Sequence, residues 1–374
     1  MKEAIGRRAA IGWSREKELT PQKLWPALRA RGGVEALLAA GQEELSLLLG
    51  SPSRARAVLD GPGDARAERW ALEIERSGVR ILTAFDEEYP RLLREIADPP
   101  LVLFAVGGLD RLRLPAVAVV GSRQATRYGR DVAARLSAGL AAVGVAVVSG
   151  LARGVDAAAH EAALEGPGGT VAVLGCGLDV DYPLENARLK EEIARRGVLL
   201  SEFPPGTEPR AQNFPIRNRI IAGLCSGVVV VEASRRSGSL ITARLAADFG
   251  RDVFAVPGSV FSETSVGAHE LLRDGAILCR GVEDIFAELF PTLDAPAPLS
   301  TPVEPPPELS GPARILFDRL RGEAGESAEE LVRETEMPAA VVLAALMELE
   351  GAGLAVEADG RYSLARRAAG RGGS

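Results

Sequence analysis

The sequence has few cysteines, and they are isolated from one another. Cys176, Cys225 and Cys279 are the only three among 374 residues, and no Cys-x-x-Cys pair occurs. Neither a disulfide framework nor a cysteine zinc site is therefore indicated. We interpret all three as small buried apolar residues rather than as reactive thiols.

Long apolar runs are missing as well. The valine-rich stretch 227–231 is far shorter than the roughly 20 residues that a membrane-spanning helix needs. The chain also starts without the apolar segment that is typical of a secretion signal. We therefore expect a soluble, cytoplasmic protein that has no membrane partner.

Recognisable catalytic motifs are absent. The sequence contains no nucleotide-hydrolysing G-x-x-x-x-G-K-[ST] loop and no H-E-x-x-H zinc motif. Of the two histidines, His160 follows Asp156 by four residues and is expected to make a helix-stabilising or capping contact with it, and His269 has no evident partner. Glu202 and Glu232 end predicted strands and could face a cleft, but no nucleophile or metal-ligand set accompanies them. We expect no enzymatic activity, no catalytic residue, no metal and no cofactor.

The net charge of −7 at first argues against a nucleic-acid partner, because phosphate binding favours a basic surface. Between Leu309 and Leu364, however, five basic residues stand against eleven acidic ones, a difference of −6. Most of the excess negative charge therefore falls in the C-terminal piece. The middle of the chain can still hold a local positive cleft.

Composition divides the chain into five parts. A helical, Ala- and Leu-rich N-terminal region is followed by an α/β core with a lead-in segment, a proline-rich linker, a small tail domain and a short basic extension. The limits that we predict for these parts are residues 1–85, 86–290, 291–308, 309–365 and 366–374.

Both ends of the chain predict small helical units. The segments 33–41 and 44–50 predict two short helices closed by glycine, within a stretch expected to be helical up to about Leu114. A SAM-like or helix-hairpin-like packing bundle is favoured there over a hairpin that binds DNA. The tail domain predicts three helices and then a hairpin with its turn at 358–360, which is the order of a winged helix.

The core alternates short apolar runs with amphipathic stretches. Continuous Val, Ala and Leu runs of this length, most of them followed by a helical segment, are typical of a parallel sheet that is buried on both faces. The predicted fold class is therefore α/β, a Rossmann-like doubly wound parallel sheet with the N-terminal helical region and the C-terminal winged helix attached. The predicted strands are 116–120, 145–148, 170–174, 198–201, 228–231, 253–256 and 276–279.

Unusual loops begin where these strands end. The loop 121–123 (Gly-Ser-Arg) follows the first strand, and the loop 149–154 (Ser-Gly-Leu-Ala-Arg-Gly) follows the second. Ligands of an open parallel sheet bind at the carboxyl ends of its strands, so the loops should converge on one site. Glycine amides, serine hydroxyls and helix N-termini favour an anion such as phosphate there. Four arginines can add positive charge with bidentate geometry: Arg123, Arg153, Arg217 and Arg219.

Two further segments favour an anion. In 214–219 (Phe-Pro-Ile-Arg-Asn-Arg), a helix that starts with proline carries two arginines and an asparagine in its first turns, which is unusual unless an anion lies nearby. Phe214 could stack on a base of a single strand or pack in the core, and the sequence leaves both alternatives open. The helix that starts at 237–239 (Ser-Gly-Ser) offers a serine cap and exposed N–H donors.

The core resembles the DNA-processing protein A (DprA/Smf) family in several motifs at once. They include VAVVGSRQATRYG (117–129), SGLARGVDAAAH (149–160), FPIRNRIIAGL (214–224) and VVVVEASRRSGSLITA (228–243). The resemblance implies a protein that binds single-stranded DNA and loads RecA onto it during natural transformation and recombination, countering single-strand-binding protein, without enzymatic turnover. It also implies a homodimer formed through the core.

The candidate DNA- and phosphate-binding residues combine the motifs carried over from this family with Arg153 from the charge argument. They are Gly121, Ser122, Arg123, Ser149, Gly150, Arg153, Gly154, Phe214, Arg217, Asn218, Arg219, Ser237, Gly238 and Ser239.

The tail resembles the winged helix of the same family, with one difference. Its helix 338–350 contains no Lys or Arg and ends in acids, so protein docking or packing is favoured over entry into a DNA groove. The basic extension could at most add loose phosphate contacts, through Arg366, Arg367 and Arg371.

Two other functions remain open. A nucleotide-phosphate ribose hydrolase of the lysine-decarboxylase-like type shares the Rossmann-like core. Its signature carries a catalytic glutamate, whereas this chain has Thr242-Ala243 where the acid would be needed. The third alternative is a sequence-specific regulator that binds duplex DNA through the winged helix.

Overall fold

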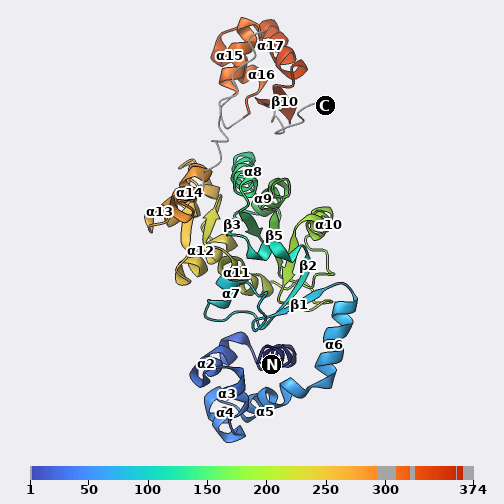
Figure 1. Ribbon diagram of the computed structural model, residues 1–374. Helices are drawn as coiled ribbons and strands as arrows, with labels where there is room; N and C mark the ends of the chain where they lie inside the picture. Colours follow the sequence, from blue (N-terminus) through green and yellow to red (C-terminus); the bar gives the residue numbers. More distant parts are fainter. Residues whose placement is uncertain (1, 293–308, 321–324, 359, 365–374) are drawn as a thin grey trace. The chain divides into compact units, whose positions relative to one another are not determined.

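The computed structural model describes residues 2–292, 309–320, 325–358 and 360–364 (Figure 1). The chain divides into two compact units, residues 1–299 and 300–374, and each is described by itself. The larger unit is built around a nine-stranded, mostly parallel sheet, and the smaller unit has the element order of a winged helix. The predicted fold class is therefore confirmed.

The larger unit starts with a run of helices and continues with alternating strands and helices. Its helices are α1 Lys2–Ser14, α2 Pro21–Arg31, α3 Val34–Leu38, α4 Gln42–Leu49, α5 Pro52–Asp60, α6 Ala65–Arg76, α7 Arg91–Arg94, α8 Arg127–Ala142, α9 Val155–Ala163, α10 Ala187–Arg196, α11 Asn213–Leu224, α12 Gly238–Asp248, α13 Val266–Arg273 and α14 Val282–Leu289. Its 3-10 turns are η1 Gly61–Gly63, η2 Leu109–Arg113, η3 Leu184–Asn186 and η4 Glu263–Ser265. Its strands are β1 Arg80–Thr83, β2 Val102–Gly107, β3 Ala116–Val120, β4 Ala146–Ser149, β5 Thr170–Leu174, β6 Val198–Ser201, β7 Gly227–Val230, β8 Asp252–Ala255 and β9 Ile277–Leu278.

The sheet has the strand order β1-β2-β6-β5-β4-β3-β7-β8-β9. The strands from β6 to β9 run parallel, and β2 and β1 extend the sheet antiparallel beyond β6. All seven predicted strands are present to within one residue at each end. The order reverses between β3 and β7, because the chain moves from β3 to β6 in one direction and then returns to β7 on the other side. Ligands of doubly wound sheets bind outside the carboxyl ends of the strands at such a switch point.

Helices cover both faces of the parallel strands, which explains why these strands are apolar without alternation. In β3, Val117 and Val119 pack in one layer with α8, α9 and α14. Ala118 and Val120 point to the opposite face, as successive strand residues do, and pack with α11 and α12. Each of these four side chains is almost completely buried. The parallel strands are therefore fixed from two sides, and the loops at their ends have a rigid base.

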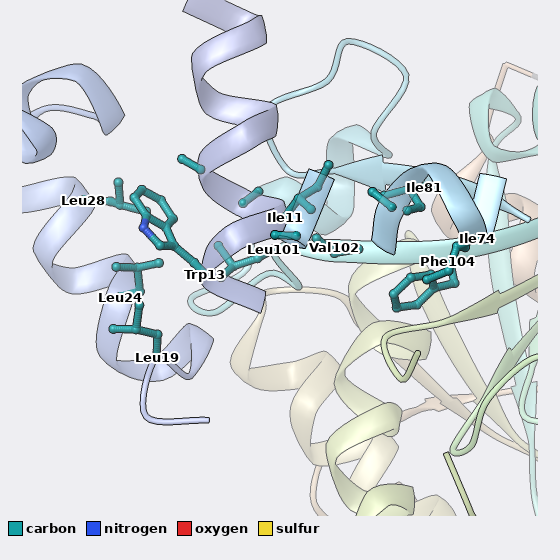
Figure 2. Close-up of a cluster of buried hydrophobic side chains, with 14 of the residues drawn as sticks. Ile11, Trp13, Leu19, Leu24, Leu28, Ile74, Ile81, Leu101, Val102 and Phe104 are labelled. Carbon is teal, nitrogen blue, oxygen red and sulfur yellow. The ribbon is translucent and has the colours of Figure 1, made fainter. Parts of the chain in front are cut away.

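The N-terminal helices pack on the antiparallel end of the sheet. Figure 2 shows Trp13 of α1 in the same apolar cluster as Ile81 of β1 and Phe104 of β2. The fully buried Trp13 donates its indole N–H to the carbonyl of Val58 at 2.9 Å. The expectation that the chain is helical up to about Leu114 is wrong for β1 and β2, because the pairing of β2 with β6 and of β1 with β2 decides their conformation rather than local helical preference.

The described residues of the smaller unit form three helices and a two-stranded hairpin, which confirms the predicted winged helix. In the capping box of its second helix, Ser327 and Glu330 each accept the other's backbone N–H. Asp359 of the predicted turn lies outside the described residues. The elements are α15 Gly311–Arg319, α16 Ala328–Thr335, α17 Ala339–Gly351, β10 Ala355–Ala358 and β11 Arg361–Leu364.

Two predicted segments fall on positions that the structure does not describe. Residues 293–308 of the proline-rich linker and the whole basic extension 366–374 lie outside the described residues. Within the described part, no helix has both the length and the apolar character that crossing a membrane requires.

Candidate nucleic-acid interface

A pocket of about 750 Å³ opens at the switch point of the sheet. Its walls come from the loop after β3, the first turns of α11, the loop after β7 and the start of α12. A second, much smaller pocket of about 30 Å³ shares the side chains of Arg123, Phe214 and Arg217 with it. The predicted site residues that line one or both pockets are Gly121, Ser122, Arg123, Gly150, Arg153, Phe214, Arg217, Asn218, Ser237, Gly238 and Ser239.

Cations and aromatic rings gather at one wall of this pocket. The exposed Arg123 makes no hydrogen bond or ion pair to any described residue, but its guanidinium lies 5.4 Å from the centroid of the Phe214 ring. The guanidinium of Arg217 lies 6.0 Å from the same ring, and the ring of Tyr182 is 5.4 Å away. Phe214 is half-buried and faces the pocket rather than the sheet core. This wall therefore offers a flat apolar face together with fixed positive charge.

Arg217 supplies its charge from beneath the pocket surface. It is almost completely buried, and its Nη1 donates to the carbonyls of Gly150, at 2.7 Å, and Val173. Burial lowers the pKa of Arg217 to about 10, against the opposing effect of the Asp156 carboxylate, so the guanidinium stays charged at neutral pH. A Cβ at position 150 would lie 2.3 Å from Nη1, so the glycine permits this close approach.

The loop 149–154 uses its amides internally. The buried carboxylate of Asp156 accepts two of them at 3.1 and 3.3 Å, and Nε2 of the buried His160 accepts a third at 3.2 Å. These amides are therefore not available to a phosphate, contrary to expectation. The expected contact between His160 and Asp156 is also wrong, because the two side chains bind different amides of one loop. The three donors are Gly150, Leu151 and Ala152.

The start of α12 retains donors that face the pocket. Ser237 caps the helix by accepting the N–H of Ser239 at 3.4 Å, and the two hydroxyls lie 2.7 Å apart. Asn218 of α11 donates to the carbonyl of Gly238 at 3.3 Å and so fixes the position of this helix start. The first turn of a helix has unsatisfied N–H groups and a partial positive charge. An anion in the pocket would therefore meet amides, hydroxyls and the N-terminus of a helix together.

Two predicted residues of the loop 149–154 lie behind the site rather than in it. Ser149 is fully buried and donates to the carbonyl of Val119 at 2.7 Å. Gly154 is the N-cap of α9 and has a φ of 79°, and a Cβ there would lie 2.3 Å from the carbonyl oxygen of Ser122. Both residues hold the loops together and do not line the pocket.

Arg219 is the third predicted residue that the structure does not bring to the pocket. Its Nη2 lies 2.6 Å from the carboxylate of Glu202, and its Nε lies 3.6 Å from Asp98. Arg219 is 5% exposed, so this ion pair is internal. Glu202, which could have faced the cleft, is used in the same pair, and burial raises its pKa against the effect of Arg219. Arg217 and Arg219 therefore have different surroundings although they are two residues apart.

The other titratable residues have structural partners. Glu232 accepts the N–H and the hydroxyl of Thr126, at 2.9 and 2.5 Å, and so fixes the N-cap of α8 instead of facing the cleft. His269 hydrogen-bonds the carbonyl of Gly258 at 3.1 Å. The cysteines are buried and free, as predicted, and burial raises the pKa of each thiol. In the part of the chain that the structure describes, no group of three or more potential metal ligands is present.

The sequence reasoning missed two residues of the site. Tyr182 lines both pockets and contacts Phe214, and Asp156 lies under the loop that it holds. Tyr182 follows the third predicted strand, 170–174, and stands beside a proline. An aromatic residue at this edge of the sheet could have been predicted as part of the site. Asp156 gave no such signal, because an acid next to an anion site looks unfavourable until its amide partners are known.

The fold and the pocket together define a class of protein. It is a Rossmann-like protein with an arginine- and serine-lined pocket at the switch point of its sheet and a winged helix in the same chain. The family model "DNA recombination-mediator protein A" matches residues 80–290, and the model "DprA winged helix domain" matches residues 300–361. The chain belongs to the DprA/Smf family.

Individual relatives agree with this assignment. The putative DNA processing protein DprA of Mycobacterium tuberculosis is 39% identical over 378 residues, which cover 97% of this chain and 96% of that protein. The X-ray structure of DprA from Streptococcus pneumoniae matches with a TM-score of 0.65 and 40% identity, over 74% of this chain and 96% of that one. DprA from Helicobacter pylori, which binds single-stranded DNA, matches with a TM-score of 0.53 and 32% identity, over 58% of this chain and 97% of that one.

Proposed function

We propose that this chain binds single-stranded DNA in its switch-point pocket and acts in DNA recombination. The observation that carries the proposal is the rim of the pocket, where Arg123 lies over Phe214 without an ion-pair partner among the described residues. Stacking of a base on an aromatic ring contributes roughly 1–3 kcal/mol and accepts every base. The guanidinium and the start of α12 can bind the phosphates on either side.

The structure supports eleven of the fourteen predicted residues as contacts of the strand, namely those that line the pockets. Ser149, Gly154 and Arg219 act through the packing of the loops in this proposal, since each has internal partners. Arg217 contributes charge through the pocket wall rather than a freely mobile side chain.

Binding rather than catalysis is the proposed activity. Among the described residues that line the pockets, Asp156 is the one carboxylate, and its hydrogen bonds to two loop amides leave it poorly placed to act as a general acid or base. Thr242, which stands where the hydrolase alternative needs an acid, lies in the pocket wall. These observations favour a protein that holds the strand without changing it.

The finer role that we propose follows from the family. The chain would load RecA onto incoming single-stranded DNA in natural transformation, displace single-strand-binding protein, and work in the cytoplasm as a homodimer formed through the core. The domain limits at 85/86, 290/291 and 308/309 are part of the same proposal. The division of the chain into two units near residue 299 supports a linker there.

A pair of arginine variants tests the site. Arg123→Ala should weaken the binding of a fluorescent oligo-dT by about ten-fold, which corresponds to about 1.4 kcal/mol, because it removes charge and a ring contact at the pocket. Arg195→Ala is the matched control. It removes the same charge from an exposed arginine in the last turn of α10, at the opposite end of the sheet, and should change the affinity less than two-fold.

The measurement is fluorescence anisotropy at one fixed salt concentration. Arg123 makes no ion pair to a described residue, so its loss should leave the urea midpoint of unfolding unchanged, and reduced binding cannot be attributed to misfolding. Equal affinities of the two variants would contradict the assignment of the site.

A further inference from the structure

A pair of exposed apolar side chains stands on the loop after β8, which we call the tip loop, residues 257–262. Phe261 is 96% exposed and Val260 is 77% exposed. Single exposed apolar residues are common, but a phenylalanine that is almost entirely in water leaves the apolar area of a full aromatic ring unburied. The position of this ring in the fold suggests what covers it.

The tip loop is held in place by its own hydrogen bonds. The N–H of Phe261 donates to the Ser259 hydroxyl at 3.3 Å, and the N–H of Ser262 donates to the Ser259 carbonyl at 3.1 Å. The hydroxyls of Ser262 and Thr264 lie 2.9 Å apart. The ring of Phe261 is therefore carried on an ordered turn, which lowers the entropic cost of binding a ligand.

The base of the tip loop is anchored as well. Tyr128 of α8 donates its hydroxyl to the carbonyl of Pro257 at 2.8 Å, and His269 of α13 hydrogen-bonds the carbonyl of Gly258 at 3.1 Å. Two helices thus fix the loop where it leaves β8. The aromatic ring projects from a base that belongs to the sheet framework.

The tip loop leaves the same edge of the sheet as the loop that lines the switch-point pocket. It follows the carboxyl end of β8, and β8 is the neighbour of β7, whose own loop forms one wall of the pocket. The loop after β7 is joined to the segment that directly follows the tip loop: the N–H of Ala233 donates to the carbonyl of Thr264 in η4, and the N–H of Gly267 in α13 donates to the carbonyl of Ala233, both at 2.7 Å. Ser234, the next residue, lines the pocket. The loops after β7 and β8 therefore lie at the carboxyl ends of neighbouring strands.

A cation without an ion-pair partner among the described residues lies in the loop after β7, between two pocket-lining serines. Arg236 follows Ser234 by two residues, is exposed, and has no ion-pair partner among the residues that the structure describes. Its neighbour Arg235 lies 3.1 Å from Glu270, so one of the two charges is neutralised and the other is available. A cation beside an exposed ring is the combination that single strands use, one for the phosphate and the other for the base.

We propose that Phe261 is a second base-stacking position for single-stranded DNA, with Arg236 binding the phosphate between it and the pocket. The proposal rests on the function proposed above and extends the bound strand from the loop after β7 to the loop after β8. The strand would then cross the carboxyl edge of the sheet, and its length in contact would exceed that of the pocket alone.

A second copy of the chain is a less suitable occupant for this tip. Stable interfaces bury about 800 Å² on each partner, whereas the tip loop exposes two large apolar side chains and the neighbouring strand β9 adds Leu278. Their neighbours in the loop are the hydroxyl residues Ser259 and Ser262, and the exposed Glu263 follows. A narrow apolar tip surrounded by polar groups suits a flat base better than a protein surface.

The test compares Phe261→Ala with Phe261→Trp on oligo-dT of two lengths, about 4 and about 16 nucleotides, which span the site sizes of single-strand-binding folds. Phe261→Ala should bind the long strand at least five-fold more weakly and the short strand unchanged, because the short strand fills only the pocket. Phe261→Trp keeps a stacking surface and should bind both lengths as the parent chain does. Leu47→Ala, which shortens an 87% exposed leucine of α4, controls for loss of exposed apolar area and should bind both lengths unchanged.

Each other outcome has a definite meaning. If Arg123→Ala weakens binding while Phe261→Ala binds the long strand normally, the second position is wrong and the pocket stands. If neither variant weakens binding, the proposed pocket itself fails. Sedimentation of the DNA-free variants adds a further readout: loss of a dimer in Phe261→Ala would identify the tip as an interface between copies and overturn the stacking role.

Discussion

Burial and hydrogen bonding both favour the neutral form of His160. Its Nε2 accepts the N–H of Leu151 at 3.2 Å, and its Nδ1 lies 2.6 Å from the hydroxyl of Thr170, which donates to the carbonyl of Val147. Nδ1 therefore carries the proton. Burial and the nearby Arg217 lower the pKa of His160 to about 3, so the ring is neutral across the physiological range.

This residue predicts a loss of stability in acid. The pKa of His160 lies near 3 in the folded chain and near its ordinary 6.5 in the unfolded chain, so the unfolded chain binds the proton more readily. The stabilising contribution is complete above about pH 6.5 and is lost as the pH falls toward 3, by about 1.4 kcal/mol per pH unit within that window. Urea unfolding of the DNA-free protein at a series of pH values measures it.

His160→Gln provides the comparison, because glutamine can accept and donate at this position without titrating. It should lose less stability than the parent chain between pH 6.5 and pH 5. Burial also raises the pKa of Asp156, but both proteins contain Asp156, so the difference between their unfolding free energies isolates the effect of His160. His269→Gln is the control for the other histidine and should behave as the parent chain does. Parallel acid profiles for His160→Gln and the parent chain would show that His160 is not buried in its neutral form.

Single residues also show where sequence reasoning stops. Arg123, Arg217 and Arg219 all follow from strand-end motifs, yet one is exposed, one is buried under the pocket and one is in an internal ion pair. The arginine side chain itself predicts a positive charge and bidentate hydrogen bonding. Whether that side chain is exposed or buried depends on which face of its helix turns toward the sheet. The motif 214–219 does not contain that information, because its partners Gly150 and Glu202 are distant in sequence.

At the scale of elements, the N-terminus of α12 is the part of the pocket whose charge can be changed without altering its shape. Gly238, the first residue of this helix, is exposed, and a Cβ there would meet no atom within 4 Å. Gly238→Asp should keep or slightly raise stability, because a negative side chain at a helix N-terminus contributes about 0.3–1 kcal/mol. The same charge should repel a phosphate and weaken the binding of single-stranded DNA by about ten-fold.

Gly238→Asn is the neutral control of nearly the same shape and should bind within about two-fold of the parent chain. Anisotropy titrations and urea midpoints of the two variants give both quantities. Equal weakening by Asp and Asn would mean that side-chain size, not charge, matters at this helix start, and the phosphate would then lie elsewhere.

Elements differ in how well their sequence predicts them. The strands from β3 to β9 were predictable because most of their positions are apolar, and those from β3 to β7 are buried on both faces. β1 and β2 were not, because they pair antiparallel at the end of the sheet and follow a long run of helices. The convergence of the loops on one edge followed from topology, but the internal use of amides in the loop 149–154 could be seen only in three dimensions.

At the scale of the whole molecule, the two units differ in the charge that they offer to DNA. In the winged helix, Arg319 pairs with Glu326 and Glu334, and Arg361 pairs with Glu330. These cations are thus engaged by the acids of their own domain.

The third helix of that domain has an apolar rather than a basic outer face. In α17, Leu343 is 48% and Met347 is 72% exposed, and the helix contains no Lys or Arg. This arrangement supports the expectation of protein docking or packing over groove binding. Single-strand binding in this account therefore belongs to the Rossmann-like unit.

The most direct test of the account is the affinity of the full chain for one sequence as a single strand and as a duplex, at two salt concentrations. We predict tighter binding of the single strand. For each phosphate contact, the logarithm of its binding constant should fall by about 0.7 for every ten-fold rise in salt concentration. Equal or tighter binding of the duplex, or single-strand binding that is insensitive to salt, would contradict a phosphate-binding pocket as the DNA site of this protein.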